Sequence, residues 1–194
     1  MAGPHNKEVA MWPYKRIFMK TEEIFKNIAL HMLKGIMIHE EMANCFAFLN
    51  LKRYEIMQEE RYLDESKELS KVNSFYISQY GKLIPKILVA EFPQIIPDVF
   101  YNHTVDDLTS NNIRQSVKDL FNAWVKWETE TKELYEQCYI DLIDNNSDVS
   151  ASIIIEKMLV DVNSELEVAK KFWYKLKSCD FDIVFILEDQ DRND

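Results

Sequence analysis

The chain has 194 residues, of which 47% are hydrophobic and 29% are charged, and its net charge is −10. This length and composition predict one folded domain with a sizeable core rather than a disordered chain. Lysines and arginines are scattered among the acids, which argues against nucleic acid or an anionic membrane surface as the main partner.

The cysteines and the N-terminal residues give no sign of secretion. Cys45, Cys138 and Cys179 are odd in number and lack the CxxC spacing of zinc or redox motifs. Residues 1–18 contain no apolar run of signal-peptide length, and no stretch of about 18 uncharged apolar residues occurs anywhere. We therefore expect a cytoplasmic protein with reduced cysteines and no membrane span.

The spacing of apolar residues predicts an all-α fold. Only three glycines occur, and apolar residues recur every three and four positions over long windows. An N-terminal arm (1–18) leads into a four-helix bundle domain (19–178), followed by a short C-terminal element and acidic tail (179–194). The predicted helices are 19–51, 54–84, one from 105–112 to 143, 150–176, and a short fifth at 181–187.

Several residues are predicted to mark the helix ends. Thr21 is expected to cap the first helix, and Pro85 to stop the second one. Thr104 and Asp107 have the spacing of a capping box before the third helix. Residues 144–150 are polar and predict the loop before the fourth helix.

The segment 85–104 has three prolines among apolar residues. It is too long for a tight turn and too apolar for a solvated linker. We expect an ordered crossover packed along the bundle, a connection typical of ferritin-like bundles. Simple up-down topology remains the alternative.

Carboxylates interrupt the apolar stripe of each predicted long helix. A helix places residues three, four and seven positions apart on one face. Glu41, Glu65, Glu128 and Glu165 each take a stripe position on a different helix, with His39 near Glu41 and Asp161 one turn before Glu165. Because the two glutamates of each predicted hairpin lie at similar depths, we expect them to face one another. Buried carboxylates need a counter-charge, a proton or a cation.

The stretches EEMANCFAFLNLKRY (40–54) and DVNSELEVAKKFW (161–173), together with Trp127-Glu128, resemble helices of the ferritin-like superfamily, including uncharacterised members from Gram-positive bacteria and their prophages. The resemblance implies a metal site holding Fe or Mn. Glu41 and Glu128 would be its bridging-type carboxylates, and Glu65 and Glu165 would take the places of the motif glutamates. The sequence departs from the family because it has no Glu-x-x-His.

Three functions remain open on sequence grounds. One is a bundle that binds one or two divalent metals through Glu41, Glu65, Glu128, Glu165, Asp161 and His39. The second is a metal-free bundle acting through protein contacts, as a homodimer or a phage or host accessory factor. The third is a bundle that binds a small molecule among its methionines and aromatic residues. No catalytic residue is predicted.

Simpler interpretations accompany these site residues. The glutamates could pair with lysine or arginine, and His39 could be a hydrogen-bonded core histidine. Residues 58–61 (Gln-Glu-Glu-Arg) are interpreted as a solvated face of the second helix.

Overall fold

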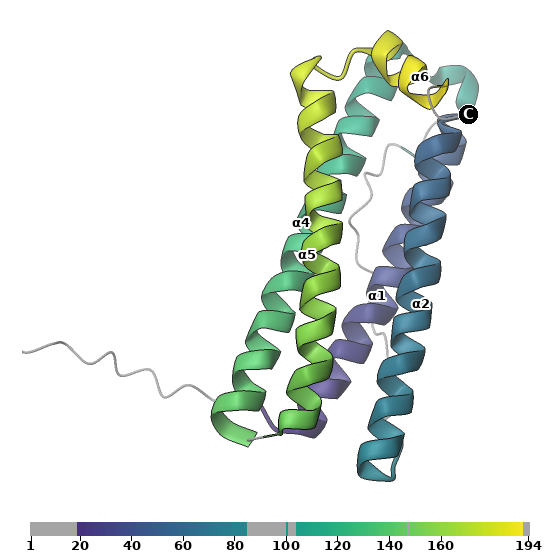
Figure 1. Ribbon diagram of the computed structural model, residues 1–194. Helices are drawn as coiled ribbons and strands as arrows, with labels where there is room; N and C mark the ends of the chain where they lie inside the picture. The colour runs from purple at the N-terminus through teal and green to yellow at the C-terminus, as the bar shows by residue number, and fades with distance from the viewer. Residues whose placement is uncertain (1–18, 85–99, 101–103, 147, 192–194) are drawn as a thin grey trace, which may run out of the picture.

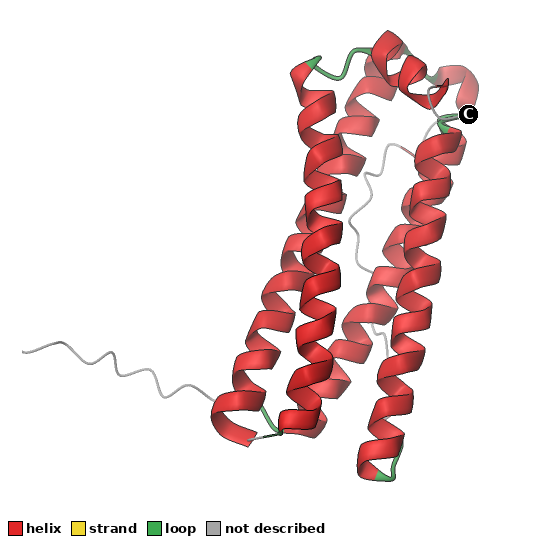
Figure 2. Cartoon of the chain, in the orientation of Figure 1, coloured by secondary structure: helices red, strands yellow, loops and turns green. Residues whose placement is uncertain are grey.

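A computed structural model describes residues 19–84, 100, 104–146 and 148–191, and this part of the chain contains helices and no strands (Figures 1 and 2). The long helices are α1 (Thr21–Phe48), α2 (Lys52–Tyr80), α4 (Ser110–Asp141) and α5 (Val149–Ser178). The short segments are the 3-10 turn Val105–Asp107, the π-helical turn Leu142–Asn146 and the helix α6 (Ile183–Asp191). The predicted all-α fold, with four long helices and a short fifth one, is confirmed.

The long helices pack as two antiparallel hairpins, α1 with α2 and α4 with α5, and the hairpins meet mainly through α1 and α4 (Figure 1). The start of α4 lies at the end of the bundle where α1 ends, since Val117 and Leu120 share a core cluster with Leu49 and Leu51. The C-terminus of α2 lies at the opposite end. The chain between Tyr80 and Ser110 therefore joins opposite ends, as a crossover bundle requires. The crossover predicted at 85–104 lies mostly outside the described residues.

The apolar core consists of two separate clusters. The α6-end core includes Phe46, Tyr54, Phe121 and Trp124, whose rings interlock, with Tyr54 and Phe121 meeting edge to face at 5.0 Å. The far-end core surrounds Phe25 and also contains residues of α2, α4 and α5. The α4 side chains of both clusters follow the apolar stripe that the sequence predicts for the third long helix, whereas Leu83, on the stripe predicted for the second helix, is 76% exposed.

The connection between α1 and α2 is a tight turn. The first helix ends at Phe48, and Asn50 has a φ of 56°, a left-handed conformation that asparagine adopts more easily than most residues. Leu51 is fully buried and directly precedes α2. The break between the first two helices is thus slightly earlier than predicted.

The ends of α1 and α2 differ from the sequence predictions. Lys20 occupies the N-cap position of α1 without a side-chain hydrogen bond, and Thr21 is already helical. The second helix ends before Gly81, whose φ of 65° suits the left-handed C-cap and whose N–H donates to the Ile77 carbonyl at 2.8 Å. Gly81 rather than Pro85 therefore ends α2, and Pro85 lies outside the described residues.

Thr104 and Asp107 form the return half of the predicted capping box, but around a different element. Thr104 donates to the Asp107 carboxylate through both its N–H and its hydroxyl, and together they enclose the 3-10 turn. The N-cap of α4 is instead Thr109, which accepts from the Asn112 N–H. Asp148 caps α5 by accepting from the Ala151 N–H at 3.0 Å, so α5 begins one residue before the predicted position.

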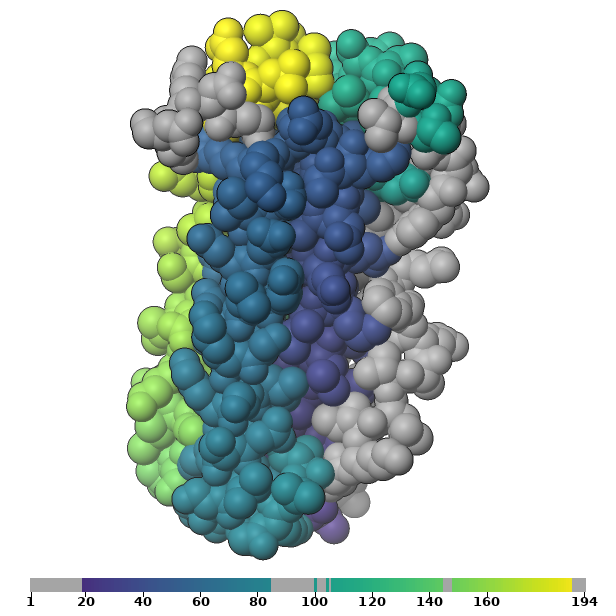
Figure 3. All heavy atoms as spheres, turned by 90° about the vertical axis from the view of Figure 1, so that its right-hand side faces the viewer, coloured from purple at the N-terminus to yellow at the C-terminus, as the bar shows by residue number. Residues whose placement is uncertain are grey.

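Helix α6 lies across one end of the bundle (Figures 1 and 3). It is held there by Asp189, which is 2% exposed. Tyr54 donates its hydroxyl to Asp189 Oδ2 at 2.9 Å, and Arg53 and Lys175 form ion pairs with the same carboxylate. Burial alone would raise the pKa of Asp189, but these donors and charges hold it below its ordinary value. Asp189 is therefore an anion that ties α6 to α2 and α5.

Candidate functional site

A layer of polar side chains separates the α6-end core from the far-end core. Each long helix contributes to it, and three of its side chains, those of His39, Gln58 and Glu128, are only 1% exposed. We call this group the polar layer. Its members are His39 on α1, Gln58, Arg61 and Glu65 on α2, Glu128 on α4 and Glu165 on α5.

His39 is fixed in the polar layer by an amide. Its Nδ1 lies 2.8 Å from Gln58 Oε1, and because an amide oxygen only accepts, Nδ1 carries the proton. Nε2 then presents a lone pair toward Glu128 Oε1 at 3.7 Å, too far for a hydrogen bond. Burial, opposed by the Gln58 hydrogen bond, lowers the pKa of His39 to about 4, so the ring is neutral at pH 7.

Glu128 is the most enclosed carboxyl group of the layer. Its Oε1 accepts a hydrogen bond from Trp124 Nε1 at 2.9 Å, while its Oε2 is buried without a hydrogen-bond partner. Burial and the charge of Glu165 raise the pKa of Glu128 to about 8, against the opposing Trp124 hydrogen bond. Glu128 therefore carries a proton over most of the neutral range.

Glu65 approaches the backbone of α1 at a glycine. A Cβ on Gly35 would lie 2.9 Å from Glu65 Oε1 and 3.2 Å from Trp127 Cζ2, so the glycine leaves the space that the carboxyl group occupies. Glu65 Oε2 is buried and has no hydrogen-bond partner. Burial raises the pKa of Glu65 well above its ordinary value, and the charges of Glu128 and Glu165 raise it further.

Arg61 supplies the positive charge of the layer. Its Nη1 donates to Glu165 Oε1, and the two side chains are 22% and 26% exposed. Burial raises the pKa of Glu165, and the neighbouring guanidinium opposes this effect. The pair joins α2 to α5 on the side where the two hairpins have few other contacts.

A second histidine lies next to the layer, on its far-end side. His31 stacks on Trp127 with ring centroids 4.1 Å apart, and its Nε2 lies 2.7 Å from Thr131 Oγ1. The Thr131 hydroxyl donates to the Trp127 carbonyl at 2.9 Å, so its oxygen accepts from His31. Burial lowers the pKa of His31 to about 4. His31 is thus a neutral ring whose Nε2 carries the proton.

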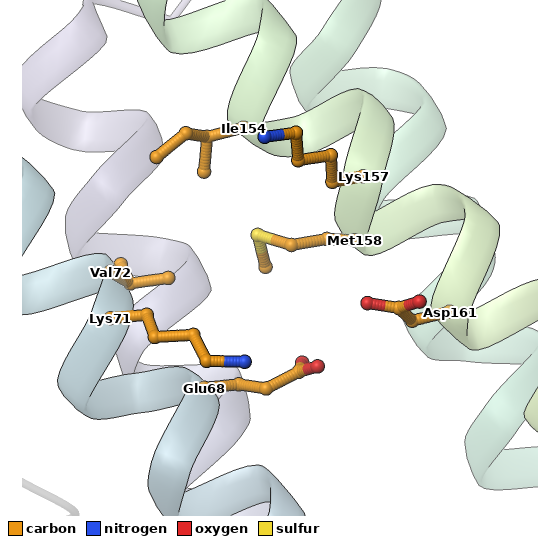
Figure 4. Close-up of a pocket in the computed structure, with 7 residues that line it drawn as sticks. All are labelled: Glu68, Lys71, Val72, Ile154, Lys157, Met158 and Asp161. Atoms are coloured by element: carbon orange, nitrogen blue, oxygen red, sulfur yellow. The ribbon is translucent and has the colours of Figure 1, made fainter.

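A groove between α2 and α5 opens beside the polar layer (Figure 4). One cavity of about 310 Å³ is bordered by Arg61, Glu165 and other charged residues. An adjoining one of about 230 Å³ has an apolar floor of Val72, Ile154 and Met158. The two share Glu68, Lys71 and Asp161. Burial and the nearby acids raise the pKa of Glu68 to about 7.

The structure brings together four of the six residues that the sequence predicts as a metal site. His39, Glu65, Glu128 and Glu165 belong to the polar layer. Asp161 is exposed in the groove, where it lines both cavities. Glu41 is outside the layer and is half-buried. Because it follows His39 by two residues, its side chain lies about 200° around the axis of α1 from that of His39. Burial raises the pKa of Glu41, whose charge acts on Cys45.

Gln58 and Arg61 are functional candidates that the sequence analysis assigned to a solvated face. That interpretation is wrong for these two side chains, because Gln58 is buried and Arg61 pairs with Glu165. The sequence spacing indicates the inward position of these side chains, because residues 61 and 65 follow residue 58 by three and seven positions and therefore share one face of a helix with it. Of these three positions, the sequence placed only Glu65 on the apolar stripe of the second helix.

The polar layer does not have the arrangement of a metal site. Glu165 is held by Arg61, and Glu41 and Asp161 lie elsewhere. Within the described ranges no group of three or more histidine, cysteine or acidic side chains could hold a metal ion. Glu65 Oε2 and Glu128 Oε2, which lack hydrogen-bond partners, and His39 Nε2 are too few ligand atoms to complete the coordination of a metal ion. The metal site implied by the ferritin-like resemblance does not fit these residues.

Comparison with known protein families finds no match for the chain, and neither does comparison with curated proteins. These comparisons identify no family, so the ferritin-like resemblance stays a prediction from the sequence. The fold and the site together define a four-helix bundle with a short C-terminal helix and a buried polar layer. No helix in the described part of the chain has both the length and the apolar character needed to cross a bilayer.

Proposed function

We propose that the protein is a metal-free helical bundle that acts through protein contacts, and that it pairs with a second copy of itself through the outer face of α5. The observation that carries the proposal is a stripe of exposed apolar side chains. Ile153, Val160 and Tyr174 are 47%, 65% and 62% exposed and are separated by seven and fourteen residues. Such spacing places them on one side of the helix, as in helices that pack against a partner helix.

The charges on this face support a second copy as the partner. In an antiparallel pairing that sets Ile153 opposite Tyr174 of the second copy, Glu156 lies opposite Lys171. The same alignment sets Val160 opposite Glu167, whose aliphatic stem can cover the valine. Opposite charges then flank apolar contacts on both sides of the two-fold axis, as a self-complementary interface requires.

The net charge of α5 also favours self-association. The whole chain carries −10, which would repel two copies that met at most surfaces. Residues 149–178 hold five lysines and four acids, a net charge of +1. Two α5 helices can therefore approach each other without the repulsion that the rest of the surface produces.

Light scattering coupled to gel filtration, over a series of protein concentrations, tests the proposal. We expect the wild-type chain to form a dimer and Val160→Glu to be monomeric. Leu63→Glu is the matched control, because Leu63 is a 47% exposed leucine on α2, away from the proposed interface. A wild-type chain that stays monomeric throughout the series would contradict the proposal.

A charge exchange tests the alignment itself. Glu156→Lys places a lysine opposite Lys171 and should weaken the dimer. Adding Lys171→Glu restores opposite charges in the antiparallel pairing and should recover it. If the double variant is as weak as Glu156→Lys alone, the antiparallel alignment is incorrect even if a dimer forms.

A further inference from the structure

One part of the groove between α2 and α5 has an apolar floor and a charged rim. Val72 of α2 and Ile154 and Met158 of α5 form the floor of this cavity, whose volume is about 230 Å³. The two helices belong to different hairpins and have few contacts with each other, which leaves the space between them open. Drug-sized ligands occupy pockets of about 300–1,000 Å³, so this cavity suits a smaller molecule.

Each of the two helices contributes one acid and one base to the rim of this cavity. Glu68 and Lys71 come from α2, and Lys157 and Asp161 come from α5. Figure 4 shows Glu68 and Lys71 extending from α2 toward α5, and Asp161 extending from α5 toward α2. A rim of both signs is complementary to a small ligand that carries both a positive and a negative charge.

The rim charges differ from the other charges of the groove in having no partners. In the neighbouring cavity Arg61 is paired with Glu165, and Lys67 is paired with Asp64. Within the described part of the chain, none of the four rim side chains forms a hydrogen bond or an ion pair. The rim therefore presents two charges of each sign above an apolar floor.

Glu68 is the rim residue at which positive charge is short. Burial, followed by the charges of Glu165 and Asp161, raises its pKa to about 7, against the opposing charge of Lys71. An ammonium group between Glu68 and Asp161 would lower this pKa and take the place of the proton on Glu68.

We propose that this cavity binds a free α-amino acid with an aliphatic side chain. The ammonium group of the ligand lies between Glu68 and Asp161, and its side chain packs on the apolar floor. Its carboxylate faces Lys71 and Lys157. An internal residue of a peptide carries neither backbone charge, so the free amino acid is the form that matches both halves of the rim. Met158 adapts to side chains of different shape, which suits leucine, isoleucine, valine or methionine.

Calorimetric titration of the full chain with each of these four L-amino acids tests the proposal, together with Tm measured at saturating ligand. We expect at least one of them to bind with one molecule per chain and to raise the Tm, because a ligand that contacts both helices binds the folded state only. The amine and the carboxylic acid that correspond to the tightest binder each lack one charged group; for leucine they are isopentylamine and isocaproic acid. Each should bind weaker by about tenfold or more, since it loses its charged contacts.

Two variants place the ligand in this cavity. Glu68→Gln and Lys71→Met should each weaken amino-acid binding by about tenfold. Glu60→Gln and Lys26→Met are the matched controls, because both residues are exposed and lie outside the groove, and they should bind as the wild type does.

Three results would overturn the proposal. One is that none of the four amino acids binds with a Kd of about 1 mM or tighter. Another is equal affinity for the amino acid and its amine, because the lysines would then contribute nothing. The third is wild-type affinity in both Glu68→Gln and Lys71→Met. Dimer formation through α5 is measured by scattering without amino acids, so the two proposals can fail or succeed independently.

Discussion

His39 on α1 donates from Nδ1 to Gln58 Oε1 on α2 at 2.8 Å, and both side chains are 1% exposed. The bond joins the two helices of the first hairpin at the level where the apolar core is interrupted. It also fixes which ring nitrogen carries the proton, and thereby directs the bare nitrogen toward Glu128.

Replacing Gln58 by leucine should destabilise the protein by about 1–3 kcal/mol, because it leaves the buried His39 Nδ1–H without an acceptor. Urea unfolding measures the change. Gln79→Leu is the control, since Gln79 is an exposed glutamine on the same helix. Equal losses in the two variants would show that the His39–Gln58 bond adds nothing to stability.

The raised pKa of Glu128 predicts how the stability of the protein depends on pH. Its pKa is about 8 in the folded chain against an ordinary value of 4.5, so between these values the folded state keeps a proton that the unfolded state has lost. The contribution of the protonated group is complete below the unfolded pKa and is lost as the pH rises toward 8. We expect the wild-type Tm to fall from pH 5 to pH 8.

Glu128→Gln should flatten this dependence, because an amide does not titrate and its oxygen can still accept from Trp124. Tm measured at several pH values in one ionic strength shows the slope. Glu130→Gln, at a 47% exposed position on the same helix, should keep the wild-type slope. Identical slopes in wild type and Glu128→Gln would assign the pH dependence to the other carboxyl groups.

Gly35 and Glu65 should be energetically coupled. Alanine in a helix interior is ordinarily more favourable than glycine by about 1 kcal/mol. In the wild-type background, Gly35→Ala brings its Cβ to 2.9 Å from Glu65 Oε1, so the carboxyl group must move and part or all of this gain is lost.

In a Glu65→Ala background the same substitution meets no carboxyl group and should be more favourable than in wild type. A double-mutant cycle by urea unfolding gives the coupling free energy, which we expect to be about 1 kcal/mol. A coupling near zero would mean that Glu65 moves away from α1 at no cost.

Tyr54→Phe should loosen α6. The substitution removes the hydroxyl that donates to Asp189 and leaves the ring packed, so the loss should be about 1 kcal/mol in urea unfolding. Hydrogen exchange should increase first in Ile183–Asp191. Tyr62→Phe is the matched control, because Tyr62 lies on the same helix, about two turns from Tyr54 and outside the proposed α5 interface. Unchanged protection of α6 would show that the two ion pairs alone hold Asp189.

Helix periodicity was enough to predict the four long helices and three carboxyl groups of the polar layer. Glu65, Glu128 and Glu165 interrupt otherwise apolar stripes, so their inward positions followed from spacing. Glu41 could not be placed in this way, because α1 is apolar on nearly all sides and its pattern points in no single direction. The Arg61–Glu165 pair depends on the distance between two helices from different hairpins, which no local pattern contains.

The polar layer also aligns the two hairpins along the bundle axis. If one hairpin slid past the other by a single helical turn, about 5.4 Å, the purely apolar cores could repack with similar side chains. Arg61 and Glu65 would then face apolar residues of α4 and α5 instead of Glu165 and Glu128. The Arg61–Glu165 pair, which crosses between the hairpins, would be broken in every shifted register, so the layer selects one register at the expense of some core stability.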